Sequence, residues 1–260
     1  MFNFLKSKET RMRAAAILVS DILLELKELT KPGVNLDMLD ELVARRIKEA
    51  GAESALKGYH PSWSKTPFPA YLCTSIDFEI CHGTSRGREL KEGSVITYDL
   101  GLRLNGAFAD AALTCSVGEI DNRKERAMRY GLQALYEGIK VVKAGVPISA
   151  IGKAIETFAI RNGYNVIKDY SGHYIGTEMH MEPCIPHYYD PKYDNILLKE
   201  GDIICIEPMC TPGNGRSVVA KEDGWTVFTA DRQICVMYEH EILVTVDGYE
   251  ILTKHINENT

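Results

Sequence analysis

The sequence lacks the features that mark secreted, membrane-spanning and nucleic-acid-binding proteins. Its seven cysteines are odd in number and include no Cys-x-x-Cys pair, which favours reduced thiols in a cytoplasmic protein over a disulfide framework. No apolar run approaches the length of a membrane span, and the first residues lack the apolar core of a secretory signal. The formal net charge of −6 gives no basic footprint, so neither DNA nor a membrane is expected as a partner.

The chain also lacks a linker or low-complexity segment, so residues 1–260 are expected to form a single domain. What it contains instead is an internal repeat. Residues 90–99 (LKEGSVITYD) and 198–207 (LKEGDIICIE) share a turn glycine, a β-branched apolar strand and a final carboxylate. The repeat predicts two pseudo-symmetric halves, about 1–120 and 121–260, each of which offers an acid to a shared site.

Two pairs of helices are predicted from apolar periodicity and capping residues. Their expected bounds are about Ser7 to Leu29, Asn35 to Gly51, about Asn122 to Val142, and Ser149 to Gly163, with Asn35 and Ser149 as N-caps. Strands are expected after each helix pair, and residues 58–69 are expected to form a loop. The order of helices followed by strands therefore occurs twice.

The dipeptide Asn105-Gly106 predicts a two-residue type I′ hairpin turn. That turn places Gly101 opposite Asp110, so Asp99 and Asp110 become diagonal neighbours on one face, roughly 7–8 Å apart. The other face is apolar, and we expect helices to cover it. For the hairpin alone, a solvated acidic face is the simpler interpretation.

The second half of the chain adds two further acids, Glu207 and Glu239, in apolar surroundings. Four carboxylates that converge without cations would repel one another, and divalent metal is the simplest way to balance them. His173 follows a glycine and adds an imidazole, although a single loop histidine is more often structural. Four acids and one imidazole suit two ions roughly 3.5–4 Å apart, and an oxygen-rich set favours Mn²⁺, Fe²⁺ or Co²⁺.

These residues and their flanks resemble the methionine aminopeptidases of the pita-bread fold, over a span from the first predicted helix to residues 250–253. The resemblance is carried by CHG at 81–83, Asp99, Asp110, His173, HMEP at 180–183, IEPM at 206–209, DGWTV at 223–227 and YEH at 238–240. It implies an α+β fold in which two pseudo-two-fold-related halves share an antiparallel sheet covered by helices. This is the architecture that the repeat predicts.

The resemblance also implies a metal-dependent hydrolase. Its family removes the N-terminal methionine from nascent proteins and peptides, prefers a small second residue, and attacks the first peptide bond with a metal-activated water. Two divalent ions (Co, Mn or Fe) would be held by five residues, with Asp110 and Glu239 bridging them. The implied ligands are Asp99, Asp110, His173, Glu207 and Glu239.

Further site residues follow from the same resemblance. Glu207 would manage the proton of the water, His180 would stabilise the developing oxyanion, and His82 would contact the scissile amide or the leaving nitrogen. Without a metal cluster, His180 would be interpreted as a surface residue and His82 as a packed turn residue. A methionine-sized substrate pocket, whose members could equally belong to the core, is expected at Tyr59, His60, Cys73, His82, Met179, His180 and Trp225.

The subtype follows from segment lengths. Only 33 residues separate His173 from Glu207, which leaves no room for the helical insertion of the second type, and no zinc-finger extension precedes the first predicted helix. The chain therefore resembles the short bacterial form of the first type. Its departures from the family pattern include Tyr174 in place of a glycine, which could narrow the cleft. None of the departures removes a ligand.

Two alternatives remain open. Enzymes that cleave Xaa-Pro bonds share the five ligands but usually carry an additional N-terminal domain, for which this chain has no room. Non-enzymatic binding modules of the same fold have lost ligands, whereas all five are present here. The expected partners are peptide and nascent-protein N-termini, with the ribosome as a further candidate, and a monomer is expected because no apolar helix face is left over.

Overall fold

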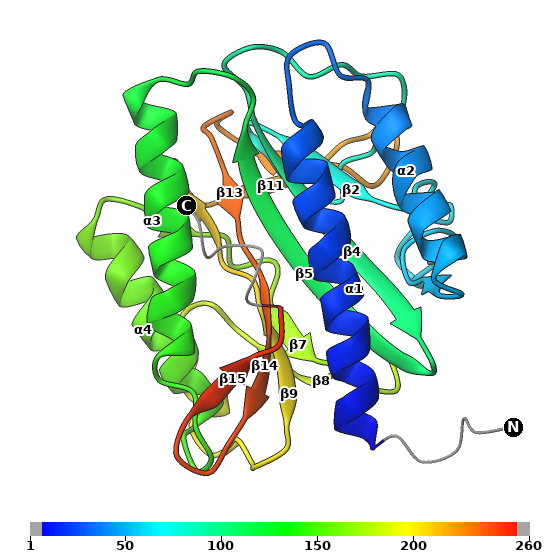
Figure 1. Cartoon of the computed structure of the whole chain (residues 1–260). Helices are drawn as coiled ribbons and strands as arrows, with labels where there is room; N and C mark the ends of the chain where they lie inside the picture. Colours follow the sequence, from blue (N-terminus) through cyan, green and yellow to red (C-terminus); the bar gives the residue numbers. More distant parts are fainter. Residues whose placement is uncertain (1–6, 254–260) are drawn as a thin grey trace, which may run out of the picture.

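The computed structural model describes residues 7–253 and contains helices packed over antiparallel strands (Figure 1). Four α-helices lie within this range: α1 (Lys8–Leu29), α2 (Leu36–Glu49), α3 (Asn122–Ile139) and α4 (Ile148–Arg161). The side chains of Ser7 and Asn35 cap α1 and α2 by accepting hydrogen bonds from backbone N–H groups in the first turn. No helix of the described range is both long and apolar enough to cross a membrane.

The N-terminus of α4 differs from the sequence prediction. Pro147 occupies the N-cap position, and no side chain caps the helix. Ile148 becomes the first helical residue because its side chain is buried and its N–H donates to the carbonyl of Ile196 at 2.9 Å. Ser149 lies inside the first turn, so the prediction that it caps the helix is wrong. The third helix is also shorter than predicted, because it ends at Ile139.

The first large sheet contains the predicted hairpin. Its long strands are β4 (Val95–Leu104) and β5 (Ala107–Ser116), and β4 also pairs with the short strands β1 (Glu53–Ser54) and β2 (Cys73–Ile76). Leu104 pairs with Ala107 and Gly101 with Asp110, which confirms the predicted register. Helix α1 lies across the apolar face of both long strands (Figure 1). The opposite face carries Asp99 and Asp110.

The second large sheet contains the second copy of the repeat. Its order is β15-β14-β9-β7-β8, and its strands are β7 (Gly172–Tyr174), β8 (Met181–Ile185), β9 (Ile203–Ile206), β14 (His240–Val244) and β15 (Tyr249–Ile251). Helices α3 and α4 pack on each other beside this sheet. A short 3-10 helix, Pro191–Tyr193, lies between β8 and β9.

Two small sheets complete the described fold. One joins β6 (Asn165–Val166), β10 (Met209–Thr211) and β13 (Val236–Met237), and the other joins β3 (Glu79–Cys81), β11 (Ser217–Val219) and β12 (Val227–Thr229). The second of these brings a strand that precedes the hairpin together with two from late in the chain. All seven cysteines are free, and six of them are buried.

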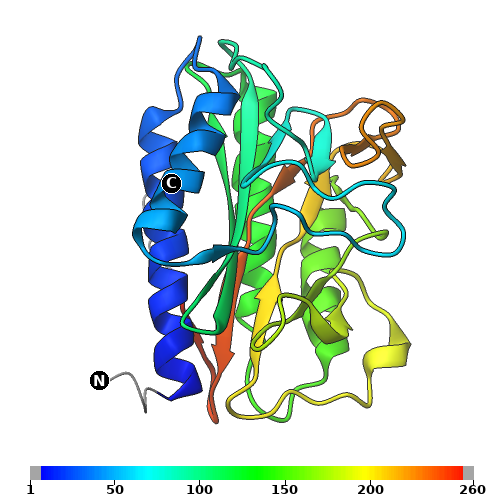
Figure 2. The same cartoon turned by 90° about the vertical axis from the view of Figure 1, so that its right-hand side faces the viewer.

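The two large sheets are joined at their acidic residues. The N–H of Glu239 donates to the carbonyl of Ala112 at 3.0 Å, and the N–H of Asp110 lies 3.4 Å from the carboxylate of Glu241. In the side view, α1 and α2 lie on one side of the long strands and the loop at residues 58–69 lies on the other (Figure 2). This arrangement leaves the acidic face of the hairpin on the side of the loops.

Candidate metal centre and cleft

The structure brings the five predicted ligands together from both large sheets. Asp110 and Glu207 each place a carboxylate oxygen near His173 Nε2, at 3.6 Å and 3.7 Å. Donor atoms of Asp110, His173, Glu239 and Cys205 all lie within 4.8 Å of one another. Asp99 lies in the same cleft as His173 and Glu207. The cluster therefore offers oxygen and nitrogen donors, together with one thiol.

Strand geometry explains this convergence. Asp99 and Asp110 belong to the neighbouring strands β4 and β5, and both point away from α1. In the second sheet, His173 of β7 pairs with Cys205 of β9, and Glu207 lies two residues further along on the same face. Side chains alternate between the two faces of a strand. The position of each donor along its strand therefore places its side chain on the face that meets the other sheet.

The carboxylates of the cluster are held in an environment that opposes their charge. Burial raises the pKa of Asp99, Glu207 and Glu239 well above the usual range, and the neighbouring charge of Asp110 raises each of them further. A cation placed among these groups would reverse both effects. The cluster thus has the electrostatic character of a site for a positive ion.

The orientation of His173 supports the same conclusion. Its Nδ1 lies 3.0 Å from the carbonyl oxygen of Tyr174, which can only accept, so Nδ1 carries the proton. Nε2 then faces the carboxylates of Asp110 and Glu207. This is the tautomer of a metal-ligating histidine whose other nitrogen is fixed by a backbone carbonyl.

Unpartnered polar atoms provide a direct test of whether these residues fit a metal. Three buried donor atoms of the cluster, Asp110 Oδ1, His173 Nε2 and Glu239 Oε1, have no hydrogen-bond partner. Leaving such atoms buried and unpaired is costly, and coordination of a divalent ion would satisfy all three. The residues therefore fit the group that the sequence resemblance implies.

The cluster opens into a cleft of about 520 Å³ that contains both predicted catalytic histidines. His82 is half-buried and has a positive φ of 55°, a strained backbone conformation for this residue. Burial lowers its pKa to about 4, with a smaller contribution from His180.

His180 lies at the open side, with its ring centre 4.5 Å from that of His173. Burial lowers the pKa of His180 as well, with a smaller contribution from His173. Both imidazoles are therefore neutral at pH 7.

The other residues predicted to form the substrate pocket lie at different places relative to the cleft. Tyr59 lines the cleft directly. Cys73 and Trp225 lie behind it in a buried apolar cluster that also contains Phe68 and Ala70. His60 is exposed and directs its Nε2 to the carbonyl of Ser64 in its own loop, so the structure does not bring it to the cleft.

Met179 reaches the hairpin because a glycine leaves space for it. Gly101 lies on the strand face of Asp99, and a Cβ built there would be 2.1 Å from Met179 Cε. The methionine side chain therefore packs against the backbone of β4 near the acids. Tyr174, by contrast, donates its hydroxyl to Asp202 at 3.1 Å and does not line the cleft. Its replacement of a glycine does not narrow the cleft.

Sequence reasoning missed several residues that the structure places at the site. Phe68 and Trp63 lie in the segment interpreted as a plain loop, where their aromatic character was the only signal. His187 is completely buried, and its Nε2 accepts hydrogen bonds from the N–H groups of Gly172 and Glu207, each at 3.2 Å. Nothing local in the sequence marks His187, because its partners come from two other strands.

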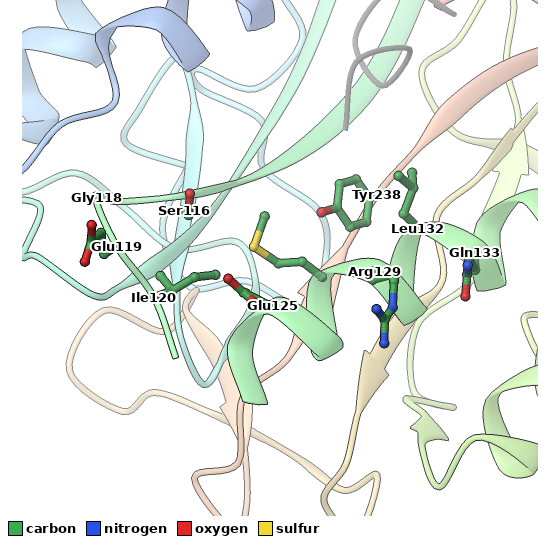
Figure 3. A pocket seen from close by; sticks show the side chains of 10 residues that line it. Ser116, Gly118, Glu119, Ile120, Glu125, Arg129, Leu132, Gln133 and Tyr238 are labelled. Carbon is green, nitrogen blue, oxygen red and sulfur yellow. The ribbon is translucent and has the colours of Figure 1, made fainter. Parts of the chain in front are cut away.

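A larger pocket of about 720 Å³ lies elsewhere, between the end of β5 and α3. Figure 3 shows this pocket, to which α3 contributes Glu125, Arg129 and Leu132, with Tyr238 from the other side. It contains none of the five predicted ligands. Size alone therefore does not identify the site, and we assign the chemistry to the smaller cleft.

Comparison with known proteins agrees with this geometry. Residues 10–246 match the model of metallopeptidase family M24. The chain belongs to this family. It is 37% identical to methionine aminopeptidase 1 of Bacillus subtilis over 94% of this chain and 95% of that protein. It is 36% identical to the methionine aminopeptidase of Escherichia coli over 94% of this chain and 90% of that protein.

Solved structures of family members confirm the α+β pita-bread fold. The crystal structure of methionine aminopeptidase from Rickettsia prowazekii has a TM-score of 0.89 at 33% identity, covering 96% of this chain and 98% of that chain. The structure from Thermotoga maritima has the same TM-score at 34% identity, covering 98% and 100%. Prolidase from Pyrococcus furiosus has a TM-score of 0.72 at 20% identity over 96% of this chain and 64% of that chain, which shows a shared fold alone.

Proposed function

We propose that this chain is a metal-dependent methionine aminopeptidase that hydrolyses the first peptide bond of proteins and peptides that begin with methionine. The observation that carries the proposal is the orientation of His173. Its Nδ1 is fixed by a backbone carbonyl and its Nε2 faces two carboxylates, an arrangement that a divalent cation would stabilise. The similarity to methionine aminopeptidases over nearly the whole chain supports the choice of substrate.

The five donors would hold two divalent ions, with Mn, Fe and Co as the candidates. Asp99 would bind one ion, His173 and Glu207 the other, and Asp110 and Glu239 would bridge them. Bound there, the ions would supply Lewis acidity that lowers the pKa of a water and polarises the substrate carbonyl.

The chain's own groups would control the proton and the developing charge. Glu207 lies at the cleft edge of the cluster, and its raised pKa suits a carboxylate that accepts and releases a proton. His180 is neutral at pH 7 and would donate an N–H to the carbonyl oxygen as that oxygen gains negative charge. His82 would hold the amide or the leaving nitrogen on the other side of the bond.

The first residue of the substrate would lie against the apolar side of the cleft. Tyr59 forms part of this wall, and the cluster of Phe68, Cys73 and Trp225 lies behind it. Such a surface favours an apolar side chain such as methionine over a charged one. We propose that the enzyme prefers substrates with a small second residue, because the family resemblance implies this preference.

The test is release of the first amino acid from Met-Ala-Ser, Met-Lys-Ser, Leu-Ala-Ser and Ala-Pro-Ser, with Mn²⁺ or Co²⁺ and again with chelator. We expect metal-dependent release of methionine from Met-Ala-Ser. Asp110→Asn should reduce this rate by more than the roughly 10–100-fold that loss of an outer-shell partner costs. Asp247→Asn, the same change at an exposed position outside the cleft, is the matched control.

A second candidate function is cleavage of Xaa-Pro bonds, which the shared fold of prolidase keeps open. Preferential cleavage of Ala-Pro-Ser would establish it and overturn the methionine proposal. Absence of both cleavage and divalent-ion binding would instead indicate a non-enzymatic binding module.

We further propose that the protein acts in the cytoplasm as a monomer on nascent chains, in contact with the ribosome. The free, mostly buried cysteines support a reducing compartment. Sedimentation of the purified protein alone and with ribosomes tests the oligomeric state and the association together. A stable dimer, or no co-sedimentation with ribosomes, would contradict the corresponding part.

A further inference from the structure

The mouth of the cleft has an apolar rim formed by Tyr59, Trp63 and Val219. All three line the cleft, yet their side chains remain 39%, 60% and 45% exposed to solvent. Large apolar side chains gathered at the edge of a cleft mark a binding surface, and tryptophan and tyrosine combine an apolar ring with a polar edge. None of the five metal donors and neither catalytic histidine belongs to this rim.

Trp63 is the member of the rim that contacts the ring of His82. Its ring is nearly parallel to that of His82, with the centres 6.3 Å apart and an interplanar angle of 22°. Its ring also makes an edge-to-face contact with Trp225, with the ring centres 5.0 Å apart. Trp63 thus contacts one residue of the cleft and one of the buried cluster behind it, while most of its own surface faces outward.

The loop that carries Trp63 is fixed to the body of the protein. Near its start and end, the N–H of Gly58 donates to the carbonyl of Phe68 at 2.9 Å, and the N–H of Phe68 donates to the carbonyl of Tyr59 at 2.8 Å. The indole N–H of Trp225 donates to the carbonyl of Thr66 at 3.1 Å. These bonds fix both ends of the loop, so the loop needs little ordering on binding.

Val219, the third member of the rim, is connected to His82 through a sheet. Val219 of β11 pairs with Val227 of β12, and Val227 pairs with Cys81, which precedes His82. Trp63 and Val219 are therefore both positioned relative to the same histidine. A peptide that leaves the cleft past His82 would meet this rim.

The spacing indicates which substrate residue the rim would meet. An extended peptide advances about 3.3–3.6 Å per residue. If His82 contacts the amide between residues one and two, a ring centred 6.3 Å away lies about two residues further along. That position corresponds to the third residue.

We propose that the rim binds the third residue of the peptide substrate and favours an apolar side chain there, with Trp63 as the specificity-determining residue. The proposal rests on the proposed function, because it takes His82 as the contact of the scissile amide. It concerns substrate residues beyond the first peptide bond. The metal donors do not contact these residues.

The experiment compares kcat/KM for Met-Ala-Leu-Ser, Met-Ala-Ser-Ser and Met-Ala-NH2 with the Mn²⁺-loaded protein. In the wild type, leucine at the third position should be favoured over serine by about three- to tenfold, mostly through KM. Trp63→Ala should remove this preference, so that kcat/KM falls more for Met-Ala-Leu-Ser than for Met-Ala-Ser-Ser or Met-Ala-NH2. Trp63→Phe, which keeps an aromatic ring, should retain most of the preference.

The matched control is Ile160→Ala, because Ile160 is a 62% exposed apolar residue of α4 that does not line the cleft. It should leave the rates with all three substrates unchanged. An equal loss on all three substrates in Trp63→Ala would show that Trp63 only supports His82, and would overturn the proposal. An unchanged leucine preference would overturn it as well.

A binding measurement separates this proposal from the proposed function. Acrylamide quenching of tryptophan fluorescence reports mainly on Trp63, because Trp225 is only 2% exposed. A Met-Ala-Leu-Ser analogue with a reduced first peptide bond should protect Trp63 from quenching more than the Met-Ala-Ser-Ser analogue does. If no peptide is hydrolysed but this protection appears, the proposed function fails and the rim stands. Hydrolysis without protection overturns the rim alone.

Discussion

His187 Nε2 lies 3.2 Å from the backbone nitrogen of Glu207 and accepts its hydrogen bond. The same nitrogen also accepts from Gly172, the residue before His173. One buried imidazole therefore fixes the backbone at two predicted metal ligands on different strands. Burial lowers the pKa of His187 to about 3, which keeps Nε2 available as an acceptor at neutral pH.

Replacing His187 by alanine should weaken divalent-ion binding by about 10–100-fold, the usual effect of losing an outer-shell partner. Two backbone N–H groups would lose their acceptor, and the backbone beside His173 and at Glu207 would be held less firmly. Calorimetric titration with Mn²⁺ measures the affinity, and the visible spectrum of the Co²⁺-loaded protein reports ligand geometry. His187→Gln, whose carbonyl can accept, should recover part of the affinity. Equal affinity in wild type and alanine variant would contradict this role.

Replacing Asp110 by asparagine should stabilise the protein in chelator and remove its stabilisation by metal. The charge of Asp110 raises the pKa of three neighbouring carboxyl groups, so its removal relieves repulsion worth about 1 kcal/mol, or roughly 2–4 °C in Tm. Wild type should gain about 2.7 kcal/mol at a metal concentration 100 times Kd, and the variant should gain little. Thermal unfolding with chelator and with Mn²⁺ measures both effects. A lower Tm of the variant in chelator would argue against repulsion.

Two glycines near the acids should respond differently to alanine. At Gly172 a Cβ would lie 2.2 Å from the backbone oxygen of Cys205, whereas at Gly101 it would meet the mobile end of Met179. Gly172→Ala should therefore cost several kcal/mol and disturb the metal centre, while Gly101→Ala should cost about 1–3 kcal/mol. Urea unfolding measures both, and Gly101→Ala combined with Met179→Ala should relieve the clash. Similar losses for the two single variants would contradict this account.

The stability of the protein should fall on acidification through buried histidines such as His240. Burial lowers the pKa of His240 from 6.5 to about 3. Between these values the unfolded chain binds a proton that the folded protein does not. The free energy of unfolding should therefore decrease by up to about 1.4 kcal/mol per pH unit from this group as pH falls below 6.5.

Comparison with His240→Asn isolates this contribution, because the variant cannot bind the proton at that position. Its free energy of unfolding, measured by urea titration between about pH 6 and pH 4, should depend less steeply on pH than that of the wild type. The absolute stability of the variant is not the readout, since His240 also contacts Thr253. Equal slopes would mean that His240 is protonated in the folded state.

Local chemistry made part of the fold predictable. The Asn105-Gly106 turn determines the register of β4 and β5, and through it the relation of Asp99 to Asp110. Ser149 was assigned as a cap from its side chain, but burial of Ile148 and its bond to a distant carbonyl decided where α4 begins. Propensity is overruled when tertiary contacts determine an end.

The same distinction applies to the site. The metal donors were predictable because carboxylates in apolar strands need a counter-charge wherever they meet. The family resemblance predicts both Tyr59 and His60 in the pocket, yet Tyr59 lines the cleft while His60 points to the carbonyl of Ser64 in its own loop. His187, Phe68 and Trp63 depend on contacts between segments far apart in the chain. No local pattern encodes such contacts.

The hydrogen bonds that join the two large sheets come from the backbone N–H groups of Asp110 and Glu239, two of the proposed ligands. Ion binding and the opening of this junction are therefore coupled, and the coupling must be reciprocal. Any change that separates the sheets weakens ion binding, and ion binding in turn slows the separation of the sheets. The exchange rates of these two amide protons would measure this coupling directly, without any substrate.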